Sequence, residues 1–200
     1  MPRRATTRCG DAVARRGRAV RALAWLLVAA WLAGGAPLCG PALADQAPPS
    51  REYQLKAAYL CNFLQFIAWP PQAFATSDSP IVITVQGENP FGTAIEQCAR
   101  GKNVRGRPIV VRYAPQAAAV GLTHVLFVAG PGAQPPQEGV GGGHVLSVAD
   151  AEHFTAAGGC VRFFAEQNKI RFEINTSAAH RAGLKIQAKL LQLARIHKED

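Results

Sequence analysis

Motifs that mark common catalytic and metal sites are missing from this sequence. The chain has no G-x-S-x-G, H-E-x-x-H or C-x-x-C motif. Its histidines stand apart at spacings that do not suit a shared metal ion. They are His124, His144, His153, His180 and His197. We therefore predict a protein that is not an enzyme and that carries no metal and no cofactor.

Apolar runs long enough to cross a membrane are also missing. The run from Ala22 to Ala33 has 12 residues, whereas about 20 are needed to span a bilayer. Seven arginines precede this run, and the small residues 42–44 follow it. This order predicts a secretory signal peptide over residues 1–44, with an uncleaved anchor as the alternative. Residues 45–50 then form a short proline-rich leader, and residues 51–200 form one domain.

The chain has little net charge once the signal peptide is set aside. The whole sequence carries 22 Lys and Arg against 13 Asp and Glu, a net charge of +9. Seven of the arginines and one aspartate lie in residues 1–44, which leaves 15 basic and 12 acidic residues. A domain with so small a basic excess does not indicate a nucleic-acid partner.

Cysteine is scarce after the signal peptide, where Cys61, Cys98 and Cys160 remain. An odd number allows at most one bridge within the chain, and Cys98 with Cys160 is the candidate pair. Cys61 lies in the middle of a predicted helix among apolar neighbours, where burial raises a thiol pKa. We interpret Cys61 as a small core residue and not as a nucleophile.

The periodicity predicts an α/β domain, a single layered structure with a mixed sheet flanked by helices and a β-hairpin near the C-terminus. The Trp-Pro-Pro sequence at 69–71 ends the first helix. Strict alternation in KIRFEI marks the second arm of the hairpin. The predicted helices are 51–68, 89–99, 175–183 and 186–196; the predicted strands are 81–86, 108–113, 123–129, 145–148, 160–164 and 169–174.

Several polar side chains are predicted to have structural roles. Asn62 lies in the first helix, where a buried amide needs partners from a neighbouring segment. Asn89 and Asn175 each stand where an N-cap residue is expected. Asp150 begins a short predicted helix that runs to Phe154, and acids are common at that position.

Several stretches together resemble the YfiR/HmsC-like family over about residues 52–196. They are YQLKAAYLCNFLQFIAWP, VQGENPFG, VRGRPIVVRY, THVLFVA, VLSVAD, FTAAGGCVRFF and KIRFEINTSAAHRAGLKIQAKLLQLARI. The resemblance implies a periplasmic repressor that binds the periplasmic sensor region of an inner-membrane diguanylate cyclase, which lowers cyclic-di-GMP and biofilm formation. It also implies a homodimer and an outer-membrane lipoprotein that sequesters the repressor.

The sequence departs from this family at three positions. The resemblance places Tyr in many members where this chain has Cys61. The resemblance places cysteines of some members where this chain has Thr84 and Thr123. A disulfide of that kind is therefore excluded here, and redox control by that route is not expected.

Candidate contacts with a partner lie on two predicted surfaces. Arg171 and Glu173 are on the outward face of the hairpin, and Lys185 and Lys189 are on the basic face of the last helix. Trp69 either contacts a partner or closes the core at the end of the first helix.

Two other functions stay open at the level of sequence. A small-molecule sensor on the same fold would use the crevice at the carboxyl ends of the strands. An enzyme would need His124, His144 or His153 to meet a serine or an acid in one cleft.

Overall fold

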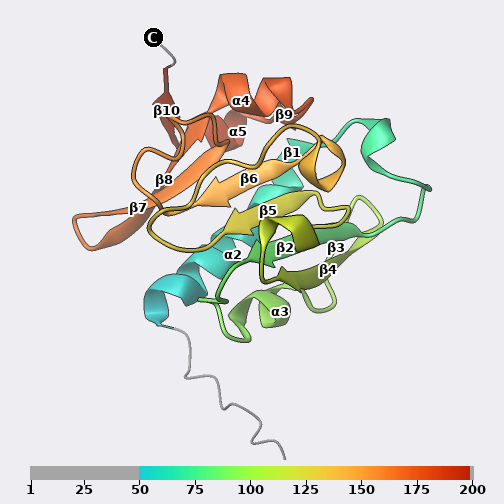
Figure 1. The fold of residues 1–200 in the computed structure, drawn as a ribbon, viewed down its shortest axis with the longest axis horizontal. Coiled ribbons are helices and arrows are strands. Elements are labelled where there is room, and N and C mark those ends of the chain that lie inside the picture. The colour runs from blue at the N-terminus through green and yellow to red at the C-terminus, as the bar shows by residue number, and fades with distance from the viewer. Residues whose placement is uncertain (1–49, 199–200) are drawn as a thin grey trace, which may run out of the picture. The chain divides into compact units, whose positions relative to one another are not determined.

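An eight-stranded mixed sheet forms the centre of the structure, a computed structural model that describes residues 50–198 (Figure 1). The strand order is β10-β8-β7-β6-β5-β2-β4-β3. Strands β4, β2, β5, β6 and β7 run parallel, and β8 returns antiparallel to β7. The predicted fold class is confirmed. The strands are β2 Ile81–Gln86, β3 Asn103–Val104, β4 Arg107–Ala114, β5 Val125–Val128, β6 Leu146–Ala149, β7 Val161–Glu166, β8 Lys169–Asn175 and β10 Arg195–His197.

The first helix, α2, spans Arg51–Phe66 and ends two residues earlier than predicted. Ser50 caps its start by accepting a hydrogen bond from the Tyr53 amide at 3.4 Å. Ile67–Ala68 is extended and forms β1, which pairs antiparallel with β9, Lys185–Ile186. Because of this pairing, Ile67 and Ala68 are extended, although the sequence pattern assigned them to the helix. The predicted signal peptide and residues 45–49 of the leader lie outside the described residues.

Helix α2 covers one face of the sheet, beside α3 (Ala94–Ala99) and α5 (Ala188–Leu191). Leu60, Phe63 and Leu64 are fully buried against β-branched side chains of the central strands. The opposite side of the helix is exposed and includes Asn62 and Leu55. The prediction that Asn62 is a buried amide tied to a neighbouring segment is therefore wrong.

The other face of the sheet has a smaller core that loops cover. Leu126, Val128, Ala149 and Phe154 pack there beneath residues 130–143 and the turns at 151–158. The loop includes the one-turn helix η3, Val140–Gly142, and the chain between β4 and β5 includes η2, Ala117–Ala119. The short helix predicted after Asp150 is absent from this part of the described chain, because the backbone there forms successive turns.

The two predicted asparagine caps have different outcomes. Asn175 accepts a hydrogen bond from the Ala178 amide at 2.8 Å and caps α4, Thr176–Arg181, as predicted. Asn89 instead closes a turn: it accepts from the Phe91 amide and donates to the Gly92 carbonyl, both at 2.9 Å. Helix α3 starts later, at Ala94, so the predicted cap at Asn89 is wrong.

The C-terminal segment differs most from its prediction. The helix expected over 186–196 is limited to α5, and Arg195–His197 then forms β10, parallel to β8. Leu193 is 66% exposed. An edge strand presents unpaired backbone groups, and pairing β10 with β8 satisfies them in a way that a longer helix would not.

The predicted hairpin is present, with longer arms than expected. Its turn residues, Gln167 and Asn168, have φ angles of +50° and +57°. Two consecutive positive φ angles are typical of the two-residue turns that match the twist of a hairpin.

Candidate functional site

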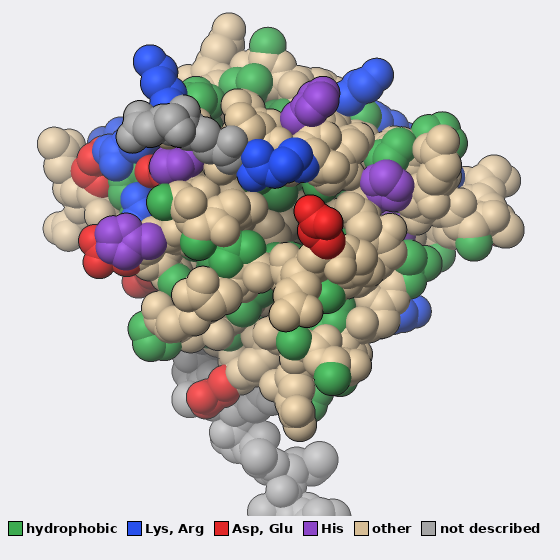
Figure 2. All heavy atoms as spheres, turned by 45° about the horizontal axis from the view of Figure 1, so that its top comes forward, with side chains coloured by type: hydrophobic (Ala, Val, Ile, Leu, Met, Phe, Trp, Pro, Cys, Tyr) green, Lys and Arg blue, Asp and Glu red, His purple; other side chains and the backbone are tan. Residues whose placement is uncertain are grey.

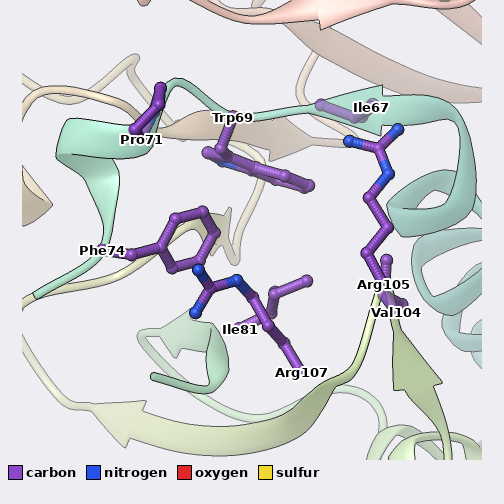
Figure 3. A pocket seen from close by; sticks show the side chains of 8 residues that line it. All are labelled: Ile67, Trp69, Pro71, Phe74, Ile81, Val104, Arg105 and Arg107. Carbon is purple, nitrogen blue, oxygen red and sulfur yellow. The ribbon is translucent and has the colours of Figure 1, made fainter. Parts of the chain in front are cut away.

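The end of α2 opens into a cavity of about 330 Å³ (Figure 3). The wall residues come from β1, the short helix η1 (Pro71–Ala73), the start of β2 and the turn between β3 and β4. Figure 3 shows the Trp69 indole across the cavity, the Phe74 ring to one side and Arg105 on the other. The full lining is Ile67, Trp69, Pro71, Phe74, Ile81, Val104, Arg105 and Arg107.

The aromatic walls of this cavity are fixed by contacts behind them. The Trp69 Nε1–H donates to the His124 carbonyl at 3.3 Å. The Phe74 ring stacks on the His124 imidazole at 4.6 Å between centroids, and the Arg107 guanidinium lies 3.7 Å from the centroid of the same ring. Arg107 also donates to the carbonyls of Thr76 and Ser79, at 3.0 and 2.7 Å.

His124 is a packed residue and not a catalytic base. It is 1% exposed, and its Nδ1 accepts from the Val82 amide at 3.1 Å. Nε2 therefore holds the proton and donates to the Ala73 carbonyl at 3.0 Å. Burial lowers the pKa of His124 below its ordinary value. The imidazole is thus neutral. It links the chain just before β5, where His124 lies, to β2 through Val82 and to η1 through Ala73.

Two arginine side chains line the cavity, and they differ in their hydrogen-bond partners. Arg107 is held by two backbone carbonyls, as described above. Arg105 is exposed on the β3–β4 turn, with φ at +51°, and its guanidinium has no partner among the described residues. No acidic side chain lines the cavity.

A second cavity, of about 340 Å³, lies at the carboxyl ends of β5 and β6, where the sequence predicted a crevice. Its charges are already paired. Lys56 is 2% exposed and contacts Asp150 and Glu52, each at 2.6 Å, and the Tyr53 hydroxyl donates to Asp150 at 2.8 Å. Burial and the Asp150 carboxylate raise the pKa of Tyr53. This network joins α2 to the end of β6, and sequence reasoning missed it because Lys56 looks like an ordinary surface residue.

The histidines proposed for an enzyme do not meet in a cleft. His124 is buried, His144 contacts the Ala182 carbonyl at 3.0 Å, and His153 is exposed on a turn. Across residues 50–198 no group of His, Cys, Asp and Glu side chains is arranged to hold a metal ion.

Cys61, Cys98 and Cys160 are free, and the predicted Cys98–Cys160 pair is therefore wrong. Cys98, on α3, instead contacts Cys61 on α2, because these two helices pack side by side. Cys160 lies elsewhere, at the start of β7, where its amide donates to the Ser147 hydroxyl at 3.0 Å. Cys61 is buried in the core, as predicted.

Thr84 and Thr123, where the resemblance places cysteines of some family members, are neighbours in the structure. The Thr84 hydroxyl donates to the Thr123 hydroxyl at 2.8 Å, and both side chains are buried. A hydrogen bond between two threonines therefore occupies the position at which the resemblance implies a disulfide in some members.

The residues predicted to contact a partner fall in two places. Lys185 pairs with Ala68 across β9 and β1, next to Trp69, and the Lys189 ammonium lies 5.9 Å from the centroid of the Phe66 ring. Arg171 is exposed on β8 near the hairpin turn, at a separate site (Figure 1).

Glu173 is not exposed, contrary to the sequence prediction. It is 7% exposed, and it accepts hydrogen bonds from Thr155 at 2.6 Å and Arg162 at 3.2 Å. His197 of β10 lies 3.2 Å away. Burial alone would raise the pKa of Glu173, but these hydrogen bonds and the nearby positive charge hold it below its usual value.

Fold and cavities together define the class: a mixed α/β domain with one helix-covered face and ligand-sized cavities at both ends of its parallel strands. The chain belongs to the YfiR/HmsC-like family, whose model matches residues 53–195. That family is regulatory rather than catalytic, and it is associated with periplasmic control of membrane diguanylate cyclases. No curated protein matches the chain. Within residues 50–198, no helix has both the length and the apolar character needed to cross a membrane.

Proposed function

We propose that this protein is a periplasmic repressor that binds the periplasmic sensor region of an inner-membrane diguanylate cyclase and lowers cyclic-di-GMP. The observation that carries this proposal is family membership over residues 53–195. The Lys56 network and the buried, neutral His124 have structural roles, because their polar groups hold elements of the fold together.

We place the partner contact around β1 and β9, at the surface defined by Trp69, Lys185 and Lys189. Lys185 and Lys189 are both exposed, and Trp69 is partly buried beside them. Figure 2 shows that basic, acidic and histidine side chains are interspersed with apolar ones on the face it presents. A mixed surface of this kind suits a specific protein contact better than a non-specific charged one. Arg171 is a second, separate candidate on the hairpin.

The proposal also includes a homodimer and an outer-membrane lipoprotein that competes for the repressor. Leu55, 46% exposed on the outer side of α2, is one apolar side chain that a second copy could cover. Light scattering of the purified protein over a range of concentrations would measure the oligomer directly.

Intracellular cyclic-di-GMP in the native host tests the proposal. We expect the level to rise when the gene is deleted and to fall again only with an exported copy, not with a copy that lacks residues 1–44. No change on deletion, in cells shown to make and export the protein, would contradict repression.

Charge reversal tests the proposed contact surface. We expect Lys185→Glu with Lys189→Glu to raise cyclic-di-GMP toward the deletion level, because reversing charges at an interface weakens association. The matched control is Arg100→Glu with Arg112→Glu, which changes the net charge equally at exposed positions, at the C-cap of α3 and on β4. Equal repression by both double variants would place the contact elsewhere.

A further inference from the structure

The cavity beneath Trp69 has the size and the walls of a small-molecule site. Its volume of about 330 Å³ is within the range of ligand pockets, roughly 300–1,000 Å³. The Trp69 indole and the Ile81 side chain lie on opposite sides of the space (Figure 3). A flat apolar group placed between them would contact an aromatic face on one side and an aliphatic side chain on the other.

These walls are formed before any ligand arrives. Trp69 is held by the His124 carbonyl, and Phe74 is held between the His124 ring and the Arg107 guanidinium. His124 is itself fixed by hydrogen bonds at both ring nitrogens. A pre-organised site loses little conformational entropy on binding, so a small ligand can bind with useful affinity.

The positive charge of the cavity lining favours a ligand that carries a negative charge. Both ionic side chains in the lining are arginines, and Arg105 has no partner within the described part of the chain. Figure 3 shows its guanidinium at the side of the cavity opposite Phe74. A free guanidinium can bind a carboxylate through two parallel hydrogen bonds.

We propose that this cavity binds a small aromatic carboxylate, with its ring against Trp69 and its carboxylate on Arg105. The proposal is independent of the proposed cyclase partner, because it concerns the isolated protein and needs no second macromolecule. It also places the small-molecule site at the amino ends of β2 and β5, opposite the crevice that the sequence predicted.

Calorimetric titration of the purified full chain with indole-3-acetate tests the site, with indole-3-acetamide as the neutral analogue. We expect saturable 1:1 binding of the acid with a Kd below about 1 mM, and binding of the amide that is weaker by about tenfold. No saturation by the acid, or equal affinity for the amide, would overturn the proposal.

Two variants show whether the named residue binds the acid. We expect Arg105→Gln to weaken binding of indole-3-acetate by about tenfold, because the charged hydrogen bonds are lost. Arg112→Gln removes an exposed arginine from the same hairpin region and should leave the Kd unchanged. Equal effects of the two substitutions would show non-specific attraction of an anion and would refute the site, whereas a cavity reserved for a partner's side chain would bind neither probe.

Discussion

Glu173 shows how a residue's surroundings can come from a distant segment. In its own strand it alternates with inward-facing side chains and points to the face that is commonly solvated. Thr155, Arg162 and His197 converge on its carboxylate from three other parts of the chain. Alternation assigned the face of the sheet correctly, but it could not reveal that β10 and a turn cover that face.

Cys98 is the residue whose chemistry we expect to differ most from its ordinary behaviour. The Cys61 thiol donates a hydrogen bond to Cys98, and the Lys102 ammonium lies 3.5 Å from its sulfur, so the pKa of Cys98 is lowered. The contact with Cys98, followed by burial, raises the pKa of Cys61, and burial raises that of Cys160. At neutral pH we therefore expect iodoacetamide to alkylate Cys98 faster than Cys61 or Cys160.

Mass spectrometry of the three cysteine peptides after timed alkylation would measure this difference. Cys61→Ala should slow the reaction of Cys98 at about pH 7 by roughly threefold or more, because the donated hydrogen bond is lost. Cys160→Ala, at a site away from α2 and α3, should leave the rate unchanged. A Cys98 that reacts no faster than the two buried thiols would contradict the expectation.

At the scale of elements, the sequence was most informative where a segment carries its own signal. The central strands are β-branched and buried on both faces, and the hairpin has its own alternation and turn, so both were predictable. Strands β1, β3, β9 and β10 have two or three residues each and exist only through pairing with other segments. No local pattern of residues 67–68 or 195–197 could have indicated them.

The same limit applied to the candidate site. Trp69 was singled out, but Phe74, Arg105 and Arg107 were not, because they come from a short helix and a turn with no motif of their own. The buried Lys56 network was also missed, since its partner Asp150 is distant in the sequence. Only the packing of α2 on the sheet brings these groups together.

His124 connects three elements, and its protonation should therefore affect stability. Its folded-state pKa lies below the value of about 6.5 in the unfolded chain, so the unfolded state binds the proton first as the pH falls. The stability that the neutral form contributes is present above about pH 6.5 and is lost between there and the lower folded pKa. We expect the free energy of unfolding to fall with pH in that interval, by up to about 1.4 kcal/mol per pH unit.

Urea denaturation from about pH 7.5 to about pH 5 would measure this slope. His124→Gln should lower stability at neutral pH and reduce the dependence on pH, whereas His180→Gln, at an exposed position on α4, should do neither. An unchanged slope in His124→Gln would show that other groups control the acid sensitivity.

On the scale of the whole molecule, β10 forms one edge of the sheet and covers the edge of β8. Strand β10 pairs with β8 over three residues, and His197 adds a contact to the buried Glu173. A chain that ends after Leu193 should lose these interactions and expose the edge of β8. We expect a loss of about 2 kcal/mol or more, seen as a Tm lower by about 2–4 °C for each kcal/mol.

Thermal denaturation followed by circular dichroism, with size-exclusion chromatography, would test this truncation. A chain that ends after His197 keeps β10 and should match the full chain. The shorter form should also associate at high concentration through its open edge. If both forms have the same Tm, β10 contributes nothing measurable to the fold.

The place of β10 also affects the order of events during folding. Strands β4 and β5 both pair with β2, so the middle of the sheet can assemble before the C-terminal strands join it. The edge of β8, in contrast, stays open until Arg195–His197 is available. A chain that lacks residues 195–197 therefore exposes an aggregation-prone strand edge, and a product truncated before them keeps that edge for its lifetime.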